Sequence, residues 1–74
     1  MRREIGYWNR EQRSRCYYLE FDEHSAEFFL TIEDGPINQP QQVQRIPLHQ
    51  AQGERYYNDA LLLIREELFK HYQP

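Results

Sequence analysis

The sequence predicts an α+β fold: a three- to four-stranded antiparallel sheet, built as a meander of β-hairpins, with one C-terminal α-helix packed on one face. Two neighbouring segments, residues 15–22 and 26–33, alternate apolar and polar residues as strands do. The last third of the chain instead repeats apolar residues at helical spacing. A length of 74 residues is enough for one domain, so residues 1–74 are expected to form a single small unit.

The first strand is expected over residues 3–8. Ile5, Tyr7 and Trp8 all favour strands, and a polar run that begins at Asn9 indicates the following turn. Gly6 lies inside this segment and weakens the prediction, because a glycine has no side chain to pack in a sheet.

The segments 15–22 and 26–33 are expected to form a hairpin. With Glu23-His24 as a two-residue tip, Leu19 pairs with Phe28, and odd residues of one strand share a face with even residues of the next. A four-residue tip preserves the same parity. The shared face is the expected core, and its residues are Tyr17, Leu19, Phe21, Phe28, Leu30 and Ile32.

The opposite face of this hairpin holds what we call the acidic-aromatic patch, which consists of Tyr18, Phe29, Glu20 and Glu27. The two-residue tip places Glu20 directly across from Glu27, an unfavourable pair unless a cation lies between them. Arg13 or Arg15 is the expected cation. The patch is then either an ion-pair ladder on a solvated sheet or a surface that binds a basic partner.

A fourth strand is expected over residues 41–46. Val43 and Ile46 have opposite parity, so the pattern predicts either a bulge or partial pairing. Pro47 cannot donate a backbone hydrogen bond and restricts this strand to an edge or its end.

The helix is expected over residues 54–72. At 100° per residue, one stripe should face the core, and it comprises Tyr57, Leu61, Ile64, Leu68 and Tyr72. Tyr56 and Leu63 fall almost opposite this stripe. They are either scattered apolar residues covered by neighbouring charged side chains, or a second contact face for another protein or a second copy of the chain.

Charge is distributed unevenly along the chain, whose net value is −3. Residues 1–15 carry five basic and two acidic residues, a net of +3, whereas residues 16–34 carry six acidic residues and no basic one. We expect the two blocks to neutralise each other across adjacent strands.

The sequence lacks the residue combinations typical of catalytic sites, and we predict no catalytic, cofactor or metal site. Cys16 is the single cysteine, which excludes an internal disulfide and a multi-cysteine zinc site. His24 at the hairpin tip lies too far along the strand to act with Cys16. The glycines are too dispersed for a phosphate-binding loop. Without an apolar run that could span a bilayer, we expect a cytoplasmic protein of bacterial or phage type that contacts no membrane.

By exclusion, the sequence predicts a small non-enzymatic protein-interaction module that serves as an adaptor, inhibitor or regulatory subunit. Its partner would be another protein or a second copy of the chain, in a homodimer. The alternative is a module for single-stranded nucleic acid that uses the N-terminal residues Trp8, Arg10, Arg13 and Arg15. Nucleic acid is the less favoured partner, because the pI is about 5.5 and the neighbouring strands are acidic.

Overall fold

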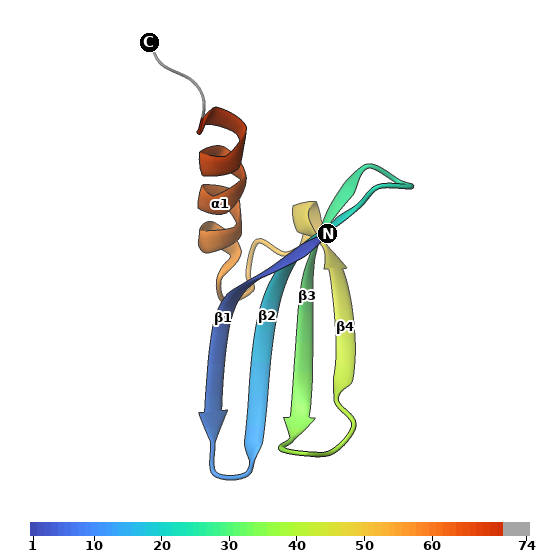
Figure 1. The fold of residues 1–74 in the computed structure, drawn as a ribbon, viewed down its shortest axis with the longest axis vertical. Coiled ribbons are helices and arrows are strands. Elements are labelled where there is room, and N and C mark those ends of the chain that lie inside the picture. Colours follow the sequence, from blue (N-terminus) through green and yellow to red (C-terminus); the bar gives the residue numbers. More distant parts are fainter. Residues whose placement is uncertain (71–74) are drawn as a thin grey trace.

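The computed structural model describes residues 1–70 and contains a four-stranded antiparallel sheet with one C-terminal helix (Figure 1). The strands are β1 (Arg2–Arg10), β2 (Arg13–Asp22), β3 (Glu27–Pro36) and β4 (Gln42–Pro47), and they lie in chain order across the sheet. A short 3₁₀ helix, η1 (Leu48–Gln50), leads toward the helix α1 (Tyr57–Phe69). The predicted α+β class and antiparallel meander are therefore confirmed.

The β2–β3 hairpin has the predicted parity but a different register. Leu19 pairs with Leu30 instead of Phe28, and Phe21 pairs with Phe28. The pairing with Glu23-His24 as a two-residue tip is wrong, since the strands are joined by residues 23–26. Ala26 has φ 56°, a left-handed conformation that helps to close this longer turn. A shift of two residues leaves every side chain on its expected face.

The predicted core face is confirmed at the centre of the sheet. Tyr17, Leu19, Leu30 and Ile32 are buried, and Leu30 is fully shielded from solvent. Phe21 and Phe28 lie at the hairpin end and are half-buried, with ring centroids 4.9 Å apart. The sheet therefore buries its central rows more completely than its tip.

Strand β1 is longer than expected and contains an irregularity. Glu4 pairs with Tyr18 and Gly6 with Tyr17, so Ile5 is an extra residue between them. Such a bulge bends the strand and changes which residues face the core. Downstream of it Trp8 pairs with Arg15, on the same face as Tyr17.

Strand β4 needs neither a bulge nor partial pairing. It pairs continuously with β3, and Ile46 lies across from Leu30 on the core face. Val43 faces the other side of the sheet and is 60% exposed. Val43 and Ile46 thus lie on opposite faces of a regular strand, because Val43 is an apolar residue that is exposed to solvent.

The core face is covered by the segment after β4. Ala51 is fully buried with Tyr17, Leu30 and Ile32, and Tyr56 packs its ring 4.8 Å from that of Tyr17. Helix α1 begins at Tyr57, after Tyr56 in a left-handed conformation, and so starts later than the expected residue 54. The predicted end at residue 72 lies outside the described residues.

The expected core stripe of α1 is only partly right, since Tyr57 packs against the core cluster and Ile64 is half-buried. Leu61 and Leu68 are 41% and 72% exposed, whereas Ala60 is the one residue of α1 that is buried. The predicted stripe residue Tyr72 lies outside the described part of the chain. Figure 1 shows that α1 does not lie across the middle of the sheet but projects at the end where β1 begins. The helix therefore touches the sheet with one narrow side, rotated by about one residue from the predicted stripe.

Candidate functional site

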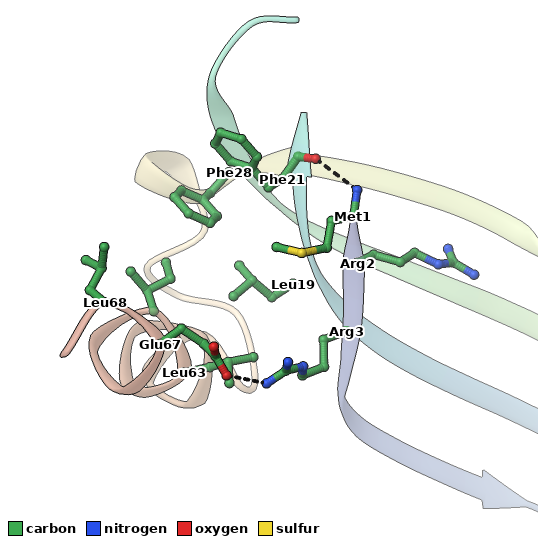
Figure 2. Close-up of a pocket in the computed structure, with 10 residues that line it drawn as sticks. Met1, Arg2, Arg3, Leu19, Phe21, Phe28, Leu63, Glu67 and Leu68 are labelled. Atoms are coloured by element: carbon green, nitrogen blue, oxygen red, sulfur yellow. Dashed lines mark hydrogen bonds and ion pairs between the residues drawn. The ribbon is translucent and has the colours of Figure 1, made fainter. Parts of the chain in front are cut away.

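An apolar groove separates α1 from the sheet. It encloses about 290 Å³ and runs between the start of β1, the hairpin end of β2 and β3, and one side of α1 (Figure 2). The lining is mostly apolar side chains: Met1, Leu19, Phe21, Phe28, Leu63, Ile64 and Leu68. The groove exists because the close contact at Ala60 lies near the start of α1, while the later turns project past the sheet.

The charged groups beside this groove are already paired. The Arg3 guanidinium donates to Glu67 Oε1 at 2.8 Å and so links β1 to α1, as Figure 2 shows. Lys70 Nζ lies 3.4 Å from the other carboxylate oxygen. Arg3 first and Lys70 second hold the pKa of Glu67 below its ordinary value. The groove therefore offers apolar surface with one paired carboxylate, shared by two cations, at its edge.

A second apolar surface lies on the side of α1 that faces away from the groove. We call it the outer stripe and define it as Leu61, Leu62, Arg65, Glu66 and Phe69. Leu62 is 51% exposed and Phe69 58%. Four of these residues, together with Lys70, line an open hollow along the helix.

Tyr56 and Leu63 do not belong to an outer helix face. Tyr56 packs against Tyr17 in the core cluster, and Leu63 is half-buried and lines the groove. Both side chains lie toward the sheet, so the expectation that they point away from it is wrong. The helical pattern could not show this, because Leu61, Leu62 and Leu63 supply apolar side chains in three successive directions.

The acidic-aromatic patch is an ion-pair ladder with aromatic rings. Arg2 lies 3.9 Å from the Tyr18 ring centroid and bonds Glu33 at 2.9 Å. Arg45 lies 4.2 Å from the Phe29 ring centroid and 3.0 Å from Glu20. Each arginine neutralises an acid while stacking on a ring, an arrangement that suits a planar guanidinium.

The predicted cation and the predicted acid pair of this patch are both wrong. Arg13 and Arg15 lie on the opposite face, and Glu20 pairs with Phe29 instead of Glu27, which lies across from Asp22. Thr31 donates its hydroxyl to Glu20 at 2.7 Å. The carboxylate of Glu20 is thus satisfied from within the sheet and is not directed at an external cation.

The N-terminal residues proposed for nucleic acid lie near one another on the core-side face. Arg15 donates twice to Asp34, at 2.6 and 3.1 Å, and once to the Tyr17 hydroxyl. Arg13 lies 3.6 Å from the same carboxylate, and Arg15 also lies over the Trp8 ring at 5.6 Å. The two arginines therefore share one aspartate, which leaves a net charge of about +1 on the three groups.

The remaining members of this group differ in exposure. Trp8 is half-buried and packs against the core cluster, whereas Arg10 is exposed and pairs with Arg13 across the first turn. The basic and acidic blocks neutralise each other only in part. Arg15 pairs with Asp34 on the adjacent strand and Arg2 reaches Glu33 two strands away, whereas Glu20 pairs with Arg45 outside the basic block.

Cys16 is half-buried on the open face of the sheet, and its thiol donates to Glu4 Oε1 at 3.0 Å. Burial first, and then the neighbouring Glu4, raises the pKa of this thiol. A thiol with a raised pKa is a weaker nucleophile at neutral pH. Within residues 1–70, no group of three or more histidine, cysteine or acidic side chains could hold a metal ion.

Comparisons with known proteins do not place this chain in a family: no family model, no curated protein and no solved structure matches it. Among the described residues, no helix has both the length and the apolar character needed to cross a bilayer.

Proposed function

We propose that this chain is a small protein-interaction module that acts by contact, as an adaptor, inhibitor or regulatory subunit, and not by catalysis. The observation that carries the proposal is the apolar groove between α1 and the sheet. Its volume of about 290 Å³ lies at the lower limit of small-molecule sites, which usually span about 300–1,000 Å³. This volume suits apolar side chains of a docked segment better than a whole substrate.

The chemistry of the groove also favours binding. Its acidic group, Glu67, is paired with Arg3 and Lys70 and has a lowered pKa, which suits an ion pair better than a general acid at neutral pH. An open apolar channel beside a helix accepts an amphipathic segment through side chains spaced three and four residues apart. We therefore propose that the occupant is an amphipathic helical segment of another protein.

A displayed library of random peptides tests this proposal directly. We expect selected peptides to carry two or three apolar residues at helical spacing, and to bind Leu68→Glu at least about tenfold more weakly than the unaltered protein. Leu68 lines the groove but is 72% exposed, so the substitution leaves the fold intact. Val43→Glu is the matched control, since Val43 is 60% exposed on the far face of the sheet.

If no peptide is enriched, or if the enriched peptides bind Leu68→Glu and Val43→Glu equally well, the groove is not a docking site.

Binding of single-stranded nucleic acid has less support. Arg13 and Arg15 are held by Asp34, and Trp8 packs against the core, so a phosphate backbone would have to compete with an existing carboxylate.

We also propose a cytoplasmic location, because Cys16 is a free thiol of the kind that reducing compartments maintain.

A further inference from the structure

We infer that the segment bound in the groove is acidic, and that it places a carboxylate beside Arg3 while its apolar side chains fill the groove. This inference rests on the proposed function, because it concerns the partner of the same site. The net charge of the chain, −3, would instead favour a basic partner. The charges at the groove itself favour the opposite sign.

The first observation is the balance of charge at the edge of the groove. Arg3 and Lys70 share the carboxylate of Glu67, with contacts of 2.8 and 3.4 Å. Two cations and one anion leave a net charge of about +1. One further carboxylate would make this group neutral, whereas a further cation would add to the excess of positive charge.

The remaining charged side chain of the groove lining, Arg2, does not alter this balance. It bonds Glu33 at 2.9 Å and lies over the Tyr18 ring, on the open face of the sheet. Figure 2 shows its side chain extending away from the groove. The excess positive charge is therefore that of Arg3 and Lys70.

The second observation is the hydrogen-bonding capacity of Arg3. A guanidinium has five N–H donors in a planar fork, and Arg3 donates from Nη1 to Glu67 Oε1 at 2.8 Å. The Arg3 side chain is 60% exposed, so its other donors can be reached from solvent. Arginine binds carboxylates well because two of its donors can bond both carboxylate oxygens at once. An incoming carboxylate can therefore bind Arg3 without displacing Glu67.

The third observation is the arrangement of the two kinds of surface. Figure 2 shows Arg3 and Glu67 on one side of the groove, and Phe21 and Phe28 on the other. A helix that packs apolar side chains against the phenylalanines thus presents one flank to Arg3. On an amphipathic helix, the polar residues nearest to the apolar stripe lie on its flanks. We therefore expect the partner to carry Asp or Glu at one border of its apolar stripe.

A displayed library of biased peptides tests the inference. Each peptide carries leucine at positions i, i+3, i+4 and i+7, which supplies the apolar stripe, and Glu, Gln or Lys at random elsewhere. We expect Glu to be selected on one flank. A peptide with Glu there should bind about threefold more tightly than its Gln counterpart, and about tenfold more tightly than its Lys counterpart. This advantage should shrink as the salt concentration rises.

Three variants separate an effect of charge from damage to the fold. Arg3→Gln should abolish the preference for Glu, whereas Glu67→Gln should increase it, because Arg3 then lacks its carboxylate partner. Damage to the fold would weaken binding in both variants. Arg10→Glu is the control: Arg10 is exposed at the other end of β1, more than about 20 Å from Arg3 at about 3.3 Å per residue. It should leave the preference unchanged.

The inference and the proposed function fail in different ways. Selected peptides that carry only Gln or Lys on both flanks would overturn the inference and leave the groove as a docking site. A preference for Glu that persists in Arg3→Gln would also overturn it. Failure to enrich any peptide with the leucine stripe, or equal binding to Leu68→Glu, would overturn the proposed function and this inference together.

Discussion

The ring of Tyr56 lies directly over Gly6. A Cβ added at Gly6 would come within 2.5 Å of the Tyr56 ring, which is closer than real contacts allow. This approach joins the bulge of β1 to the segment that begins α1, and it brings Tyr56 onto Tyr17 at 4.8 Å. The position of the helix therefore depends on the absence of a side chain in the first strand.

Gly6→Ala should destabilise the protein by about 1–3 kcal/mol, the usual cost of overpacking a well-filled site. Urea denaturation measures the change. Gly53→Ala is the matched control, because a Cβ at Gly53 meets nothing within 4 Å. The cost at Gly6 should shrink in a Tyr56→Ala background, and an equal cost in both backgrounds would contradict the contact.

Asp34 should make stability depend on pH in the acid range. Hydrogen bonding from Arg15, followed by the charges of Arg15 and Arg13, lowers the pKa of Asp34 in the folded state. In the unfolded chain the pKa is about 3.9. The folded state therefore binds fewer protons, so this stabilisation is complete above about pH 4–5 and is lost as the pH falls through the folded pKa.

Carbon-detected NMR titration of the Asp34 carboxyl measures this pKa directly. We expect a value below 3.9 in the unaltered protein and a return toward about 3.9 in Arg15→Gln. Asp34→Asn should reduce stability at pH 7 by about 1 kcal/mol, since the pair is part-exposed and is screened by water. A carboxyl that titrates at its ordinary value would contradict the assigned contact.

The fluorescence of Trp8 should not respond to single-stranded oligonucleotides at low salt. Trp8 is half-buried, and Arg15, which lies over its ring, is bound to Asp34 together with Arg13. Asp34→Asn releases both arginines and should give weak, salt-sensitive quenching. Strong quenching in the unaltered protein, abolished by salt, would instead support the nucleic-acid alternative.

Cys16 should react slowly with iodoacetamide at pH 7.5. Its raised pKa, caused by burial and by Glu4, lowers the fraction of thiolate. Unfolding in urea should accelerate the reaction, and Glu4→Gln should do so to a smaller extent in the folded state. A folded protein that is alkylated as fast as the unfolded chain would show that the thiol is neither shielded nor held by Glu4.

The sequence by itself determined the faces of β2 and β3, because alternation with a period of two assigns each side chain to a side of the sheet. Tyr17, Leu19, Leu30 and Ile32 lie in the core whether the hairpin tip has two residues or four, since both preserve parity. The longer tip requires a left-handed backbone at Ala26, where φ is 56°. Because alanine is not a residue typical of turns, the sequence could not show which tip forms.

The tertiary structure alone decided which side of α1 meets the sheet and which arginines neutralise the open face. The helix has apolar residues in several directions, so its pattern allows more than one orientation, and the contacts of Tyr56 with Gly6 and Tyr17 select one. Arg2 and Arg45 reach the rings of Tyr18 and Phe29 from the two edge strands. Their positions depend on the bulge in β1 and on the register of β4, which arise from pairing between segments distant in the chain.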